Sequence, residues 1–96
     1  MDFVLSLEAR EDLLDIEAYI AADSPRAAAR VIDDIFDAFG KLACNPEMGH
    51  ARQDLTSQPV RFWTVHSFMI IYDPHTAPLA VARVLSGYRD LAKLLG

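Results

Sequence analysis

The spacing of apolar residues predicts a short strand and then a helix at the start of the chain. Segment 3–7, FVLSL, alternates weakly between apolar and polar positions, as a strand does. After it, apolar residues recur at helical spacing, at Ala9, Leu13, Ile16 and Ile20. Acidic residues accompany the beginning of this stripe, and acids are favoured at a helix N-terminus. The polar sequence ADSPRAA, residues 22–28, ends the helix.

A second amphipathic helix is predicted from Ser24 onward. Serine is a frequent N-cap, and the proline that follows it suits the first helical turn. The apolar stripe consists of Ala28, Ile32, Ile35, Phe39 and Leu42. The solvated face carries Arg30, Asp33, Asp34 and Asp37. Two amphipathic helices joined by a short break predict an antiparallel helical hairpin.

The second half of the chain alternates between turns and strand-like segments. A loop at 44–55 contains Pro46 and Gly49, which both interrupt helices. Three strands are predicted after it, at 59–65, 68–73 and 79–85, and a short helix or tail at 88–95. The fold class is therefore α+β, in one domain over residues 1–96. The N-terminal strand and a three-strand antiparallel meander form one sheet, and the helical hairpin packs on one face.

Composition places the chain among cytoplasmic globular proteins. Hydrophobic residues make up 52% of the sequence, yet no apolar run is long enough for a membrane span. The first residues lack the basic region of a signal peptide. Cys44, the single cysteine, fits a reducing compartment and is expected to be a buried apolar residue. His50 and His75 lie in loops at no metal-ligand spacing, so neither a metal nor another cofactor is predicted. His66 is expected to be an exposed residue at the tip of a strand hairpin.

Charge is distributed unevenly along the sequence. The net charge is −5, but residues 1–40 carry three arginines against ten acids, whereas residues 41–96 carry six basic residues against four acids. The total charge disfavours uniform binding to a phosphate backbone. A local anion-binding patch in the second half remains compatible with this distribution.

Four segments together resemble the RelE/ParE superfamily of bacterial toxins from type II toxin–antitoxin systems. They are the loop NPEMGHARQDL, the pair RFWTV and FMIIYD, and the ending ARVLSGYRDL. The long helical hairpin and this ending are more similar to the ParE branch than to the RelE branch. Resemblance to ParE implies inhibition of DNA gyrase or a related type II topoisomerase. Resemblance to RelE implies cleavage of messenger RNA on the ribosome.

The family resemblance also implies a cognate, ParD-like antitoxin, whose C-terminal segment folds along the toxin. Operator DNA is then contacted only through the antitoxin. The helical hairpin offers a surface for this segment, because its apolar residues exceed what one buried face needs. Leu14 and Phe36 are the expected contacts on that second face.

Cleavage of RNA needs a general base, a general acid and cations that stabilise the phosphorane. Arg61 and Arg83 could supply the cations and Tyr88 a proton. Many relatives carry histidine at the position of Ser86, whose hydroxyl is a weak base. The sequence therefore favours a toxin that acts by binding. A RelE-like endoribonuclease and a non-toxic relative that serves only as the antitoxin's partner are the alternatives.

Arg83 lies within an otherwise apolar strand, where an unpaired guanidinium is costly to bury. Strand alternation places it on the same face as Val81 and Leu85. One interpretation is a structural ion pair between Asp90 and either Arg83 or a neighbouring arginine. The other is an exposed arginine beside Arg61 that receives the antitoxin or the target. The complete set of expected binding residues is Arg52, Arg61, Arg83, Tyr88, Arg89, Leu14 and Phe36.

Overall fold

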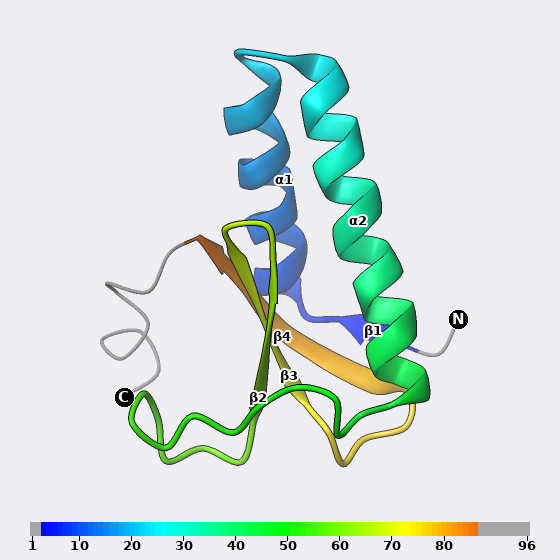
Figure 1. Cartoon of the computed structure of the whole chain (residues 1–96), viewed down its shortest axis with the longest axis vertical. Helices are drawn as coiled ribbons and strands as arrows, with labels where there is room; N and C mark the ends of the chain where they lie inside the picture. Colours follow the sequence, from blue (N-terminus) through cyan, green and yellow to red (C-terminus); the bar gives the residue numbers. More distant parts are fainter. Residues whose placement is uncertain (1–2, 87–96) are drawn as a thin grey trace.

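A helical hairpin stands against a four-stranded sheet in the computed structural model of the chain, which describes residues 3–86 (Figure 1). The helices are α1 (Leu7–Ala21) and α2 (Pro25–Cys44). The strands are β1 (Phe3–Leu5), β2 (Arg61–Val65), β3 (Phe68–Asp73) and β4 (Leu79–Ser86). This confirms the predicted α+β class and the order of its elements. The helix or tail predicted at 88–95 lies outside the described residues.

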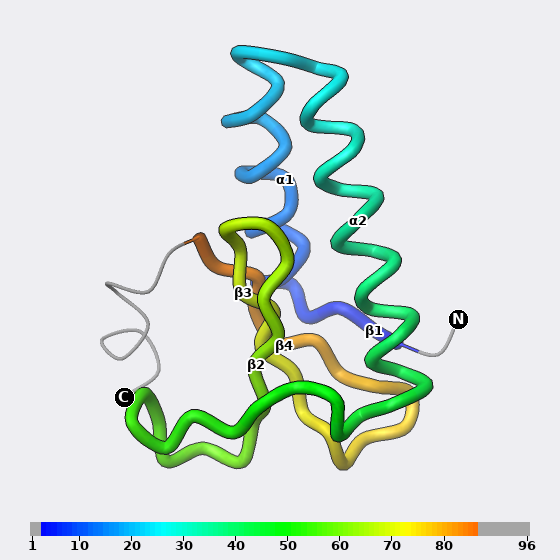
Figure 2. Tube along the Cα trace, in the orientation of Figure 1, coloured from blue at the N-terminus to red at the C-terminus, as the bar shows by residue number. Residues whose placement is uncertain are grey.

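The sheet has the strand order β1-β4-β3-β2. Strands β2, β3 and β4 form the predicted antiparallel meander, and β1 joins its edge in parallel with β4. The path of the chain in Figure 2 shows both helices extending past the sheet, with the turn between them at the far end. Neither helix of the described part is both long and apolar enough to span a membrane.

Serine caps fix the start of both helices. The Ser24 hydroxyl accepts a hydrogen bond from the backbone N–H of Ala27, as the sequence predicted. The Ser6 hydroxyl does the same for Ala9, at 2.9 Å. Because Ser6 is already the N-cap of α1, the first strand ends at residue 5 and is shorter than the predicted 3–7.

A register shift in the sheet changes which way the residues of β4 point. Tyr72 pairs with Val81, but the preceding residue, Ile71, pairs with Arg83. One extra residue of β4 is thus accommodated, as in a β-bulge. Val81 is buried under the helices, whereas Leu85 packs on the opposite side of the sheet. Arg83 and Leu85 share one face, as predicted, because they pair with Ile71 and Met69, but the prediction that Val81 lies on that face too is wrong.

Two apolar clusters hold the fold together. The larger lies between the helical hairpin and the sheet, and it contains Ile35, Phe39, Ile70 and Tyr72. The smaller lies on the other face of the sheet, where part of the loop after α2 covers it. Its buried members are Phe62, Met69 and Ile71. Both faces of the sheet are therefore apolar, which explains why all of the first five residues of β3 are buried.

The loop after α2 is anchored by Tyr72, whose side chain is fully buried. Its hydroxyl donates to the carbonyl of Pro46, at 2.6 Å, and accepts from the N–H of Gly49, at 2.9 Å. Burial raises the pKa of the Tyr72 hydroxyl, so the phenol stays protonated and able to donate. The loop then pairs with the outer edge of β2 through a bridge between His50 and Phe62.

We expect Gly49→Ala to lower the free energy of unfolding by about 1–2 kcal/mol, because a Cβ there overpacks the anchor. The added atom would lie 2.5 Å from the Tyr72 hydroxyl and 3.0 Å from the Phe62 carbonyl. Urea unfolding measures the effect, and Gly40→Ala is the control, since nothing lies within 4 Å of a Cβ there. The loss should shrink in a Tyr72→Leu background, which removes both the hydroxyl and the ring carbon that lies 2.8 Å from the added atom. Equal losses in both backgrounds would contradict the proposed clash.

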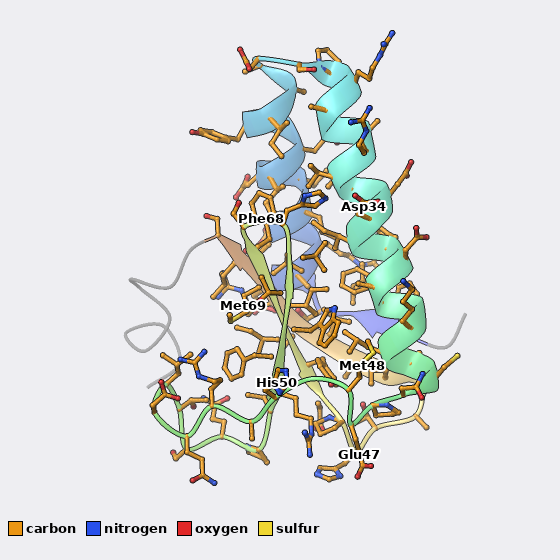
Figure 3. All side chains as sticks on the ribbon, viewed as in Figure 1. Asp34, Glu47, Met48, His50, Phe68 and Met69 are labelled. Atoms are coloured by element: carbon orange, nitrogen blue, oxygen red, sulfur yellow. The ribbon has the colours of Figure 1, made fainter. Side chains whose placement is uncertain are left out.

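Two exposed side chains, those of His66 and Cys44, lie outside the core. His66, at the turn between β2 and β3, has a positive φ of 56° and its Nε2 lies 2.7 Å from an Asp34 carboxylate oxygen. Figure 3 shows Asp34 on α2, level with this turn. The contact fastens the strand hairpin to the helical hairpin. Cys44 is exposed at the end of α2, so its predicted burial is wrong.

Candidate functional site

The surface that best fits a binding function is a groove between α1 and α2. It encloses about 320 Å³ and is lined by Leu5, Arg10, Leu13, Leu14, Glu17, Ile32 and Phe36. Five of these seven residues are apolar. Leu14 is 64% exposed and Phe36 is 36% exposed, which is unusual for large apolar side chains. We call this surface the hairpin groove.

The amphipathic pattern of both helices creates the hairpin groove. On α1, Leu13 points into the core while its neighbour Leu14 points to solvent. On α2, Phe36 stands beside the core residue Phe39, with ring centroids 5.2 Å apart. The ring of Phe36 also meets that of Phe3, at 6.2 Å. These edge-to-face contacts hold Phe36 in place as one wall of the groove.

The structure brings together the two residues predicted to meet the antitoxin, because Leu14 and Phe36 line the same groove. Sequence reasoning missed the two charged residues of the lining, Arg10 and Glu17. They lie on α1 one turn before and one turn after Leu14, so helical spacing alone would have placed them on the same face.

Arg83 forms an ion pair with Asp12 of α1. Its Nε and one terminal nitrogen lie 2.8 and 3.0 Å from the two carboxylate oxygens. The same carboxylate accepts a hydrogen bond from the backbone N–H of Val84, at 3.0 Å. The hydrogen bonds to Asp12 raise the pKa of Arg83, against a smaller opposing effect of burial. Arg83 therefore has a structural ion pair, but its partner is Asp12, which the sequence did not indicate. The predicted partner, Asp90, lies outside the described residues.

Asp12 also covers an unpaired edge of the sheet. Strand β1 pairs with β4 only as far as Val81. Beyond it, Ser6 bonds to the carbonyls of Val81 and Ala82, and Asp12 bonds to the N–H of Val84. The start of α1 thus satisfies backbone groups that a longer first strand would otherwise have paired.

Arg61 and Arg83 do not form one cationic surface. Arg61 pairs with Tyr72 and Arg83 with Ile71, and these neighbours on β3 belong to clusters on opposite faces of the sheet. One terminal nitrogen of Arg61 donates to the carbonyl of Gly49 at 2.8 Å, which helps to hold the loop. Among the described residues, no carboxylate or histidine contacts both arginines.

Arg52 lies in the same loop and binds the Asp54 carboxylate through two hydrogen bonds, at 2.9 and 2.8 Å. These bonds lower the pKa of Asp54. Arg52, Arg61 and His75 line a second, polar hollow of about 320 Å³ at the foot of the sheet. The remaining predicted binding residues, Tyr88 and Arg89, lie outside the described residues.

Comparison with known proteins decides the family. Residues 3–91 match the family model of the ParE toxin of type II toxin–antitoxin systems, parDE. The chain belongs to the ParE toxin family. A ParDE system implies a ParD antitoxin as the partner of this toxin.

A solved structure supports the fold of this ParE chain. A chain described as the chromosomal ParDE TA system from P. aeruginosa superposes with a TM-score of 0.74 at 20% sequence identity. The similarity covers 92% of this chain and 97% of that one. At this identity the match shows the fold alone. No curated protein sequence matches the ParE chain significantly.

Proposed function

We propose that this ParE chain arrests bacterial growth by binding DNA gyrase or a related type II topoisomerase in the cytoplasm, and that a ParD-like antitoxin neutralises it. The antitoxin's C-terminal segment occupies the hairpin groove, and operator DNA is reached only through the antitoxin. Family membership supports the toxin–antitoxin assignment. The hairpin groove carries the assignment of the antitoxin site, because exposed apolar side chains at its walls lack a cover.

The contacts of Arg61 and Arg83 support inhibition by binding, because both arginines are engaged within the protein and are not arranged for catalysis. Arg83 is engaged by Asp12, and Arg61 donates to a loop carbonyl. An endoribonuclease of the RelE kind would need both guanidinium groups at one phosphate, together with a base. Their placement on opposite faces of the sheet does not provide such a site within residues 3–86.

The target is tested by two assays run on the same purified toxin. We expect loss of gyrase supercoiling, or accumulation of cleaved DNA, and no cleavage of messages on translating ribosomes. Message cleavage with unaffected gyrase would instead favour the endoribonuclease. Expression of the chain alone in bacteria separates the third alternative, since a non-toxic partner of the antitoxin would leave growth normal.

A further inference from the structure

Two opposite charges mark the ends of the hairpin groove. Arg10 and Glu17 both line it, with Leu14 between them on the same face of α1. The two residues are seven positions apart on the helix, so their attachment points lie about 10 Å apart along the axis. The apolar floor and walls occupy the interval, and Ile32 and Phe36 of α2 face it. The groove therefore has a positive and a negative end.

Neither charge is engaged elsewhere in the described part of the chain. The ion pairs there join Arg52 to Asp54, His66 to Asp34, and Arg83 to Asp12. Arg10 and Glu17 are both exposed and take part in none of them. A pair of uncompensated charges at the rim of an apolar groove offers contacts to an occupant without breaking any internal bond.

The chemistry of the groove selects a helix as its occupant. The walls formed by α1 and α2 have paired backbone groups, so they offer no donors or acceptors to an extended strand, and the edge strand β1 contributes only Leu5 to the lining. An occupant of an apolar groove must then satisfy its backbone internally, as a helix does. A third helix also packs naturally between the side-chain ridges of two others.

Charge excludes a second copy of this toxin as the favoured occupant. The exposed charges of α1 are four acids, Glu8, Glu11, Asp15 and Glu17, against the single base Arg10. On α2 the exposed charges are Arg26, Arg30 and Lys41 against Asp33 and Asp37, so the hairpin as a whole keeps an excess of acids. A second hairpin would therefore bring like charge to the interface. A partner with basic flanks gains attraction from the same residues.

We propose that the hairpin groove takes an amphipathic helix of net positive charge, which places a carboxylate beside Arg10 and a basic side chain beside Glu17. This inference rests on the proposed antitoxin site and specifies which charges of the antitoxin helix that site recognises. The two opposite charges in the partner stand about seven residues apart, with an apolar stripe between them. Arg10 and Glu17 then act as specificity determinants that fix the direction in which the partner helix lies.

The experiment measures the Kd of the full-length toxin for a synthetic peptide of the ParD-like antitoxin's C-terminal segment. The toxin variants are R10E, E17R and the double variant R10E/E17R, which has the same net charge as the natural protein. We expect each single reversal to weaken binding about tenfold at low salt, and less at high salt. The double variant should bind weakly to the natural peptide and regain affinity for a peptide with its two charges exchanged.

The control is R26E, the same charge change on an exposed residue of the first turn of α2, outside the groove lining. It should leave the Kd nearly unchanged. If R10E/E17R has an unchanged Kd while Leu14→Asp still abolishes binding, Arg10 and Glu17 are not specificity determinants, and the groove remains the antitoxin site. Binding insensitive to Leu14→Asp as well would remove that site. A free toxin that sediments as a dimer until Leu14 is replaced would make the second copy the occupant.

Discussion

Leu14→Asp is expected to weaken binding of the ParD-like antitoxin by at least about 100-fold while leaving the toxin folded. Leu14 is 64% exposed, so an aspartate there remains hydrated in the free protein. In the complex the same carboxylate would be buried against an apolar helix face, without a partner. Truncated or disrupted central apolar contacts at interfaces cost about 2–4 kcal/mol. Titration calorimetry and circular dichroism measure the affinity and the fold.

A matched control separates the groove from general surface effects. Tyr19→Asp introduces the same charge on the same helix, at a residue that is 82% exposed and does not line the groove. Its Kd should stay close to that of the natural protein. Phe36→Ala is expected to weaken binding too, but with some loss of stability, because Phe36 also contacts Phe3 and Phe39. Equal affinity of Leu14→Asp and Tyr19→Asp would reject the groove as the antitoxin site.

The helical hairpin could be predicted from local sequence because its signals are local. Ser24 and Pro25 mark the start of α2, and the apolar stripes have the helical period. Leu14 and Phe36 could be assigned to a second face for the same reason, since each lies beside an apolar residue that faces the core. Binding residues that depend on helical spacing could therefore be predicted from the sequence. The same reasoning would have identified Arg10 and Glu17.

The partner of Arg83 could not be predicted, because the contact spans 71 positions of sequence. Asp12 is one of several acids on α1, and nothing in its immediate neighbours distinguishes it from Asp15. The register shift at Ile71 also left no signal, since no glycine or proline marks it. Strict alternation, which takes no account of that shift, therefore placed Val81 on the wrong face relative to Arg83. These errors share a cause: each depends on how separate elements meet.

The contact between Tyr72 and the loop after α2 could not be predicted from local sequence either. Pro46 and Gly49 identified a loop, but not the buried hydroxyl of Tyr72 that holds it. Nothing in the local sequence explains why a glycine occupies position 49. Only the tertiary contact explains it: a side chain at residue 49 would collide with the tyrosine. Turn signals in the sequence thus located the loop, whereas packing against Tyr72 determines that residue 49 is a glycine.

Asp12→Ala is expected to be the most destabilising single change among the polar contacts described, by about 3 kcal/mol. The substitution removes both hydrogen bonds to Arg83 and the acceptor for the Val84 N–H. The side chain of Arg83 is only 30% exposed, so its charge would be left largely without hydration or a partner. Urea unfolding of the purified toxin gives the change in free energy.

The double-mutant cycle of Asp12 and Arg83 distinguishes an ion pair from a general effect on α1. The double variant Asp12→Ala/Arg83→Ala should be little less stable than Asp12→Ala alone, which corresponds to a coupling free energy of about 1–3 kcal/mol between the two residues. Asp12→Asn should be more stable than Asp12→Ala but less stable than the natural protein, because the amide oxygen still accepts from the Val84 N–H while the charge attraction to Arg83 is lost. Asp15→Ala, exposed on the same helix, is the control and should change stability little. Additive effects of the two changes would mean that Arg83 is held by something other than Asp12, and Arg83 would return to the set of candidate binding residues.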